Sequence, residues 1–275
     1  MVITLYQQDI LWAAPAENRQ RVERELEAAK CDLFVVPETF TTGFGDHMAA
    51  LAEAPDGPTL QWARRMAARH NILFVGTWIV RDGGHCYNRL HWVYPDGRHG
   101  HYDKGHTFRV SGEADQISRG TERMTFEYQG WRIRPAVCYD LRFPKWLRNN
   151  VEFRKSNFEN DENTHNSKIK NQNSKLDYDL LLVCANWPGS RREAWTTLLR
   201  ARAIENMCYA VGCNRSGTDG AEIPYTGDSA IVDYKGLPLA EATGEQCISA
   251  TLDRERLEGF RHRWPFHLDF DQHLP

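Results

Sequence analysis

Residues 132–144 read RIRPAVCYDLRFP, and this stretch combines a predicted strand with a candidate reactive cysteine. Its first half is a strand-like run with β-branched residues that ends on Cys138, and Asp140, Arg142 and a proline follow. A cysteine here is either a buried core sulfur, which is the commoner fate of free cysteine, or a nucleophile. The other residues that the chain brings beside it decide between the two.

The composition is that of an ordinary globular protein. The 275 residues are 41% hydrophobic and 26% charged, and no Pro-, Ser- or Gly-rich linker divides them, so we expect a single domain over residues 1–275. The formal charge of −3 argues against nucleic acid as the main partner. The chain opens on a strand-like run, MVITLYQQDI, instead of a signal peptide, and its apolar runs are too short for a bilayer. We therefore expect a cytoplasmic protein with no membrane contact.

The cysteines point to the same compartment. Their number is odd, the chain is large and no CxxC pair occurs, which favours reduced thiols over a disulfide framework. Taken one at a time, each is expected to be structural. The seven are Cys31, Cys86, Cys138, Cys184, Cys208, Cys213 and Cys247.

Short apolar strands alternate with amphipathic helices along the chain. The pattern predicts strands at 33–38, 72–80, 180–186 and 208–214, and helices at 58–70 and 191–206. Turn signals predict hairpins that turn at 95–97, 129–130 and 235–236. This mixture indicates an α/β fold with a mixed sheet, or two stacked sheets with helices outside.

Residues 151–177 do not fit this pattern. The segment holds six asparagines and four of the chain's eight lysines, but only one of its 26 arginines. It is polar, non-periodic and poor in aliphatic residues, so we interpret it as a flexible polar insertion within the domain. A lid or partner-binding loop is the less favoured alternative. We expect the insertion to emerge far from the active crevice, so that catalysis survives it.

Three reactive residues follow predicted strands. Glu38 ends LFVVPE, Lys104 lies in HYDKGH and Cys138 ends IRPAVC. Reactive groups in open α/β sheets gather at the carboxyl ends of strands, where a crevice forms. A thiol needs a base, which a desolvated carboxylate can supply, and acyl transfer needs positive charge at the developing oxyanion. Each residue alone is weak evidence, because glutamate also caps turns and lysine is usually solvated.

Together the three residues lie in sequence blocks that resemble the nitrilase superfamily of carbon–nitrogen hydrolases. The resemblance runs to about residue 255, is interrupted by the insertion, and keeps the order Glu, Lys, Cys. The blocks are VVPETFTTGF, HYDKGHTFR, PAVCYDLRFP, ANWP and RARAIENMCYAVGCNRSG. The resemblance implies a four-layer α-β-β-α sandwich with two mixed sheets, and a homodimer formed through helices.

The resemblance also assigns roles to residues. It implies that Glu38 is the general base, that Cys138 is the nucleophile, and that Lys104 and the backbone N–H of Tyr139 hold the oxyanion. Glu113, whose alignment is looser, matches a second glutamate that supports the lysine and the substrate. The implied reaction is hydrolysis of an amide through a cysteine thioester, with no metal or organic cofactor.

Within the superfamily the blocks look most like the bacterial omega-amidase branch. That likeness implies hydrolysis of the side-chain amide of 2-oxoglutaramate to 2-oxoglutarate and ammonia. Such a substrate carries a carboxylate, for which Arg142 is our candidate, because guanidinium binds carboxylate bidentately. A structural ion pair is the equal alternative for Arg142. Phe44 and Trp187 are candidate pocket walls, although aromatic residues are as often plain core.

Three alternatives stay open at this point. One is another amidase branch, acting on deaminated glutathione, an N-carbamoyl group or a nitrile. A metal-dependent hydrolase is the second, but the histidines lack HExxH or Cys/His zinc spacing, and His99 and His101 are expected to flank a hairpin turn. The third is a non-catalytic scaffold, against which the presence of all three reactive residues argues. The clustered histidines are His85, His91, His99, His101 and His106.

Overall fold

The computed structural model describes residues 1–153 and 174–269. Most of the predicted insertion at 151–177 therefore lies outside the described residues. Its two described ends form a small antiparallel pair, β8 (Val151–Phe153) and β9 (Ser174–Leu176), with Phe153 opposite Ser174. No helix in the described part of the chain is long and apolar enough to cross a membrane.

Two mixed sheets form the centre of the molecule. The first has the order β15-β1-β2-β3-β4-β5, and the second has the order β12-β13-β11-β10-β7-β6 with β14 paired to β13. The first sheet consists of β1 (Val2–Gln7), β2 (Leu33–Val35), β3 (Leu73–Asp82), β4 (His85–Val93), β5 (His99–Asp103) and β15 (Gln246–Thr251). The second consists of β6 (Phe126–Tyr128), β7 (Trp131–Val137), β10 (Leu180–Ala185), β11 (Tyr209–Asn214), β12 (Ser216–Thr218), β13 (Pro224–Val232) and β14 (Pro238–Thr243).

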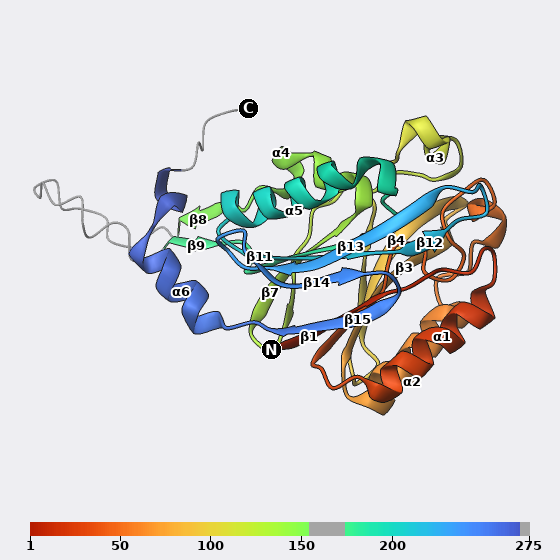
Figure 1. Ribbon diagram of the computed structural model, residues 1–275, viewed down its shortest axis with the longest axis horizontal. Helices are drawn as coiled ribbons and strands as arrows, with labels where there is room; N and C mark the ends of the chain where they lie inside the picture. The colour runs from red at the N-terminus through yellow and green to blue at the C-terminus, as the bar shows by residue number, and fades with distance from the viewer. Residues whose placement is uncertain (154–173, 270–275) are drawn as a thin grey trace, which may run out of the picture.

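Helices cover the outer faces of both sheets. Figure 1 shows α1 (Pro15–Ala28) and α2 (Pro58–His70) on one side of the stacked sheets and α5 (Arg192–Glu205) on the other. The expected four-layer α-β-β-α sandwich is thus confirmed. The remaining helices are α3 (Glu113–Gln116), α4 (Pro144–Leu147), α6 (Arg254–Arg263) and the short 3₁₀ turns η1 (Met48–Leu51), η2 (Arg109–Ser111), η3 (Cys138–Arg142), η4 (Gly189–Arg191) and η5 (Phe266–Asp269).

The apolar runs of the central strands are continuous because both of their faces are buried. In β2, Leu33 and Val35 pack between the two sheets, whereas Phe34 packs under α1 and α2. In β10, Leu182 faces the first sheet, and Leu181 packs under α5. This double burial is the expected environment of parallel strands covered on both sides, and it anchors their carboxyl ends rigidly.

The predicted elements are present, with two differences in detail. Strand β2 ends at Val35 and not at residue 38, since Pro37 has no N–H for a ladder. Cys138 does not end the strand as predicted; β7 stops at Val137, and Cys138 begins η3. His99 and His101 lie in β5, the strand that follows the hairpin turn after β4, as expected.

Candidate active site

Cys138 sits on a sharp turn where β7 passes into η3. Its φ of +45° lies in the left-handed region, which costs a side-chain-bearing residue about 1–3 kcal/mol. The side chain is half-buried, and its Sγ lies 3.8 Å from the backbone oxygen of Asn186, which follows the neighbouring strand β10. The N–H groups of Cys138 and Tyr139 belong to the first turn of η3, where a helix has no internal acceptors.

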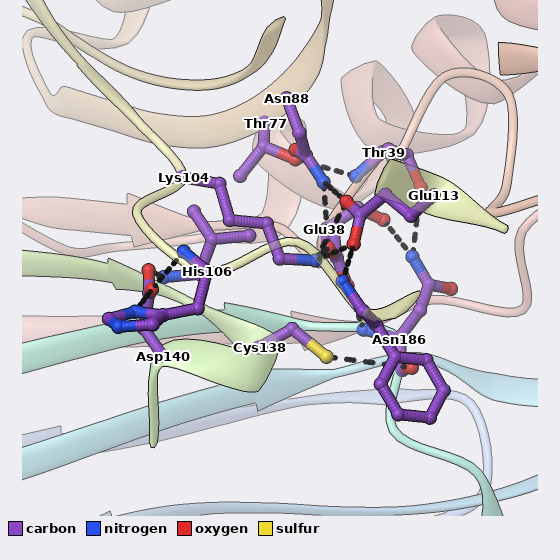
Figure 2. Close-up of polar contacts among 12 residues, drawn as sticks. Glu38, Thr39, Thr77, Asn88, Lys104, His106, Glu113, Cys138, Asp140 and Asn186 are labelled. Carbon is purple, nitrogen blue, oxygen red and sulfur yellow. Dashed lines mark hydrogen bonds and ion pairs between the residues drawn. The ribbon is translucent and has the colours of Figure 1, made fainter. Parts of the chain in front are cut away.

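The carboxylate of Asp140 holds this turn in place. Its Oδ2 accepts hydrogen bonds from the Val137 N–H at 3.0 Å and the Tyr102 hydroxyl at 2.7 Å. Its Oδ1 accepts from the backbone N–H of His106 at 2.9 Å and lies 2.8 Å from Nδ1 of the same residue. Asp140 is fully buried, so three of these contacts, one to Tyr102 and two to His106, tie the cysteine turn to the end of β5. Figure 2 shows the pair of Asp140 and His106. These tertiary contacts stabilise the left-handed backbone conformation of Cys138.

Glu38 lies three residues beyond β2, and its carboxylate accepts hydrogen bonds from three groups. Its Oε1 accepts from the Lys104 ammonium at 2.8 Å and the Asn88 side-chain amide at 2.7 Å, and its Oε2 accepts from the Asn186 N–H at 2.8 Å. The Asn186 side chain in turn donates to the Glu38 backbone oxygen and to Thr39. The carboxylate is fully buried in the interior between the two sheets.

Lys104 follows β5 directly and points between two carboxylates. Its Nζ lies 2.8 Å from Glu38 and 2.9 Å from each carboxylate oxygen of Glu113, the first residue of α3. All three side chains have no exposed surface. Figure 2 shows the ammonium between the two glutamates and the thiol of Cys138 facing the same space. Three charges from three separate elements thus form one closed cluster beside the thiol.

The charges of this cluster and burial shift the pKa values of Glu38, Lys104 and the Cys138 thiol. Burial raises the pKa of Glu38, Lys104 opposes the rise and the Glu113 carboxylate adds to it. Burial also raises the pKa of the Cys138 thiol, and the Glu38 charge raises it further. Burial lowers the pKa of Lys104, but Glu113 and Glu38 together raise it by more, so the lysine stays charged. The arrangement contains a neutral thiol, a carboxylate with raised basicity and a permanent cation.

A cavity of about 710 Å³ opens directly onto the thiol. The structure brings six of the eight predicted site residues to its wall: Phe44, Lys104, Cys138, Tyr139, Arg142 and Trp187. Glu38 and Glu113 lie behind the wall, in contact with Lys104. The Arg142 guanidinium lies 4.9 Å above the Trp187 ring and has no ion-pair partner among the residues that the structure describes. The structural ion pair that was the alternative for Arg142 is thus not formed with any acidic side chain in residues 1–153 and 174–269.

Sequence reasoning missed several residues that complete the site. Asn186 holds both the backbone and the carboxylate of Glu38, Asn88 donates to both glutamates, and Asp140 fixes the cysteine turn. Asn186 follows a buried strand in the ANWP block, the same position that singled out Cys138, so its place at a strand end was available as a signal. No signal in the sequence marked Asn88, because it lies in the middle of strand β4 and contacts Glu38 only across the sheet.

Three of the clustered histidines lie near one another: the ring of His91 is 6.2 Å from that of His99 and 6.1 Å from that of His101. His91 is buried and stacks on Trp78 at 4.0 Å, whereas His106 binds Asp140. Within residues 1–153 and 174–269, no group of three or more His, Cys, Asp or Glu side chains is placed to hold a metal ion. All seven cysteines are free, as predicted, and four of the six cysteines other than Cys138 are buried.

Comparisons with known proteins agree on one family. The model of the family described as carbon-nitrogen hydrolase matches residues 2–152 and 161–262. The chain is 38% identical to the omega-amidase YafV of Yersinia enterocolitica, over 99% of this chain and 97% of that protein. It is 30% identical to the 2-oxoglutaramate amidase of Bacillus subtilis, over 99% and 98% of the two chains.

A solved structure shows the same arrangement of the whole chain. It is that of XC1258 from Xanthomonas campestris, described as a CN-hydrolase superfamily protein with an arsenic adduct in its active site. The two chains are 40% identical, the TM-score is 0.91, and the match covers 100% of this chain and 98% of the other. Fold and sequence therefore point to the same family.

Proposed function

The chain belongs to the carbon–nitrogen hydrolase family, and on this premise we propose that it hydrolyses the side-chain amide of 2-oxoglutaramate to 2-oxoglutarate and ammonia. The observation that carries the proposal is the Cys138 thiol on the wall of a cavity, beside the buried Glu38–Lys104–Glu113 cluster and in front of the guanidinium of Arg142. The two curated relatives, an omega-amidase and a 2-oxoglutaramate amidase, support the choice of substrate.

The first half-reaction forms a thioester. Glu38 takes the proton of the Cys138 thiol as the sulfur attacks the amide carbon, and the raised pKa of Glu38 makes it a better acceptor for that proton. The Lys104 ammonium and the N–H of Tyr139 in the first turn of η3 stabilise the oxyanion, and each such donor contributes on the order of 10²–10³-fold. Glu38 then gives the proton to the leaving nitrogen, and ammonia departs.

The second half-reaction returns the enzyme to its starting state. Glu38 removes a proton from water, the hydroxide attacks the thioester carbon, and the tetrahedral intermediate forms on the same two donors. Its collapse breaks the carbon–sulfur bond, and Glu38 returns the proton to Cys138. Glu113 does no proton transfer in this scheme. It keeps Lys104 charged and in place through its two 2.9 Å contacts.

Arg142 is the proposed contact for the substrate carboxylate. Its guanidinium is held on the Trp187 ring at the wall of the cavity, with no carboxylate of its own in the described part of the chain. Such a group binds a carboxylate with two parallel hydrogen bonds. The rings of Phe44 and Trp187 supply apolar walls for the carbon chain of the substrate. The amide carbon is thereby directed toward the thiol.

Three further properties belong to the same proposal. We propose a homodimer, a cytoplasmic location and a reaction that needs no metal or organic cofactor. The seven free cysteines support a reducing compartment. The acid–base and oxyanion roles are all filled by side chains and backbone groups, which supports cofactor-free hydrolysis. The insertion at 151–177 is proposed to be an addition to one catalytic domain that spans the chain.

Release of ammonia from 2-oxoglutaramate tests the proposal. We expect wild-type turnover, and we expect Cys138→Ala to lose at least about 10⁴-fold in kcat because no nucleophile remains. Mass spectrometry of acid-quenched wild-type enzyme should detect the acyl group on the peptide that contains Cys138. Cys31→Ala, which removes another half-buried thiol, should keep full activity.

Competing substrates sharpen the test. Succinamate should be hydrolysed, whereas a nitrile, an N-carbamoyl amino acid and deaminated glutathione should be poor substrates. Faster turnover of any of these three than of the omega-amides would assign the chain to another branch of the family. Activity that persists in Cys138→Ala would refute the thioester mechanism itself.

A further inference from the structure

Arg191 is a second guanidinium at the same cavity that the reaction scheme above does not use. It ends the short turn η4 and lines the cavity together with Cys138, Lys104 and Arg142. Its guanidinium lies 5.2 Å above the ring of Phe108, another residue of the cavity wall. Arg191 has no ion-pair partner among the described residues, so its charge is available to a ligand.

Trp187 fixes the two arginines relative to each other. Its indole N–H donates to the backbone oxygen of Arg191 at 2.9 Å, and its ring carries the guanidinium of Arg142 at 4.9 Å. The N–H of Arg191 also donates to the Pro188 oxygen at 3.0 Å. One buried side chain thus holds the backbone of Arg191 and the guanidinium of Arg142, and the ring of Phe108 lies under the Arg191 guanidinium, which reduces the entropy cost of ordering the two cations around a ligand.

The charges of the cavity wall favour an anionic substrate. The wall contains Lys104, Arg142 and Arg191, and the lysine is already matched by the two glutamates behind it. Two carboxylates also line the cavity. Asp219 accepts hydrogen bonds from two backbone N–H groups and the Tyr225 hydroxyl, and Asp46 is exposed on the loop after β2. Two guanidinium groups therefore face the cavity without a matched anion of their own.

We propose that Arg191 is a specificity-determining residue that, with Arg142, selects a 2-keto acid as the acyl part of the substrate. This inference rests on the proposed function and names what the site recognises beyond the amide. A 2-keto acid offers a carboxylate and an adjacent carbonyl oxygen, all acceptors, to two groups that only donate. Glutamine offers a 2-ammonium group at the same place, which the guanidinium groups repel and cannot hydrogen-bond.

The experiment compares substrates that differ only at this end. 2-Oxoglutaramate, glutaramate, glutamine and the neutral glutaramide are assayed with wild type, Arg191→Gln and Arg191→Lys. We expect Arg191→Gln to lose about 10–100-fold in kcat/KM for 2-oxoglutaramate, mainly through KM, because one charge-assisted contact is removed. The change for glutaramide should stay within about threefold. Arg191→Lys should recover part of the loss, since it keeps the charge but not the planar donor pair.

Arg192→Gln is the matched control. Arg192 is the next residue and carries the same charge, but it pairs with Asp228 at 2.6 Å outside the cavity. This variant should keep wild-type kcat/KM on all four substrates. Binding of the product 2-oxoglutarate to the Cys138→Ala enzyme, measured by calorimetry, should weaken when Arg191→Gln is added and stay unchanged when Arg192→Gln is added.

The outcomes separate the role of Arg191 from the proposed function. If wild type hydrolyses 2-oxoglutaramate but Arg191→Gln behaves like Arg192→Gln, the inference is overturned and the proposed function stands. The same holds if Arg191→Gln loses equally on glutaramide, which would show a general structural effect. If wild type hydrolyses none of the four amides, the proposed function and the inference fall together.

Discussion

The two sheets contribute opposite kinds of residues to one cavity. The first supplies Glu38, Lys104 and Glu113, which are fully buried and hydrogen-bonded to one another. The second supplies Cys138, whose backbone lies in the left-handed region, and exposed Arg142. The first side sets protonation states in a closed, low-dielectric cluster, and the second side presents the nucleophile and the cations that meet the substrate. Substitutions can therefore disturb the protonation states of the cluster and the position of the nucleophile separately.

The largest effect is expected on the side of the first sheet. Lys104→Met leaves two buried carboxylates facing each other without a cation, which should lower the free energy of unfolding by about 3–5 kcal/mol and abolish turnover. Without the opposing lysine, burial and the Glu113 charge raise the pKa of Glu38 further in the folded state. Ionisation of Glu38 then costs stability as the pH rises above its unfolded pKa, so the loss should be larger at pH 7 than at about pH 5, nearer that pKa. Urea unfolding at both pH values measures this.

Exposed Lys145 on α4 provides the control for this variant. Lys145→Met removes the same positive charge from solvent and should change stability by less than about 0.5 kcal/mol. A Lys104→Met protein with wild-type stability at neutral pH would show that the two glutamates are not ionised together, and the charge assignment of the cluster would have to be revised.

A smaller effect is expected from the anchor of the cysteine turn. Asp140→Asn turns one acceptor oxygen into a donor that faces other donors, so we expect about 1–3 kcal/mol lower stability. A shifted nucleophile should also cost on the order of 10²-fold in kcat. Urea unfolding and steady-state kinetics on the same preparations measure both. Unchanged kcat would mean that the left-handed turn holds without its carboxylate.

A substitution at Asp179 separates the effect of Asp140→Asn on stability from its effect on kcat. It is a buried aspartate just before β10, and it forms ion pairs with Arg132 and Arg261. Asn186, which contacts the Cys138 thiol, follows the other end of β10. At about 3.3 Å per residue the two ends of this strand are ~20 Å apart. Asp179→Asn should therefore lower stability as much as Asp140→Asn does, yet keep wild-type kcat. A comparable loss of kcat in both variants would make the effect of Asp140→Asn a general consequence of lost stability.

The smallest effect is expected from the insertion. β8 and β9 lie beside α6 at the end of the molecule away from α3 (Figure 1), and Asp177 after β9 leads into the start of β10. Replacing residues 154–173 by an Asn-Gly turn between Phe153 and Ser174 should leave kcat within about twofold of wild type, because the active site lies at the opposite end of β10. Steady-state kinetics checks this, and a loss above tenfold would contradict the placement.

The fold was predictable because its signals are local. Apolar runs bounded by turn residues marked β3, β10 and β11, and Pro58 with helical spacing marked α2. The differences arose where tertiary contacts override the local pattern. The run toward Cys138 looks like continuous strand, but Asp140 bends it into η3 by binding the Val137 N–H, and no propensity of the cysteine itself announces a positive φ.

The sequence by itself determined which chemistry is present: a thiol, a carboxylate and a lysine, each after a strand and in the order of a known family. Only the tertiary structure decided how these groups act on one another. Glu38, Lys104 and Glu113 come from three separate elements, and the pKa values of Glu38 and Lys104 depend on burial and on distances of 2.8–2.9 Å that sequence order does not contain. Asn88, Asp140 and Arg191 join the site for the same reason: electrostatic and hydrogen-bond energies depend on separation in space.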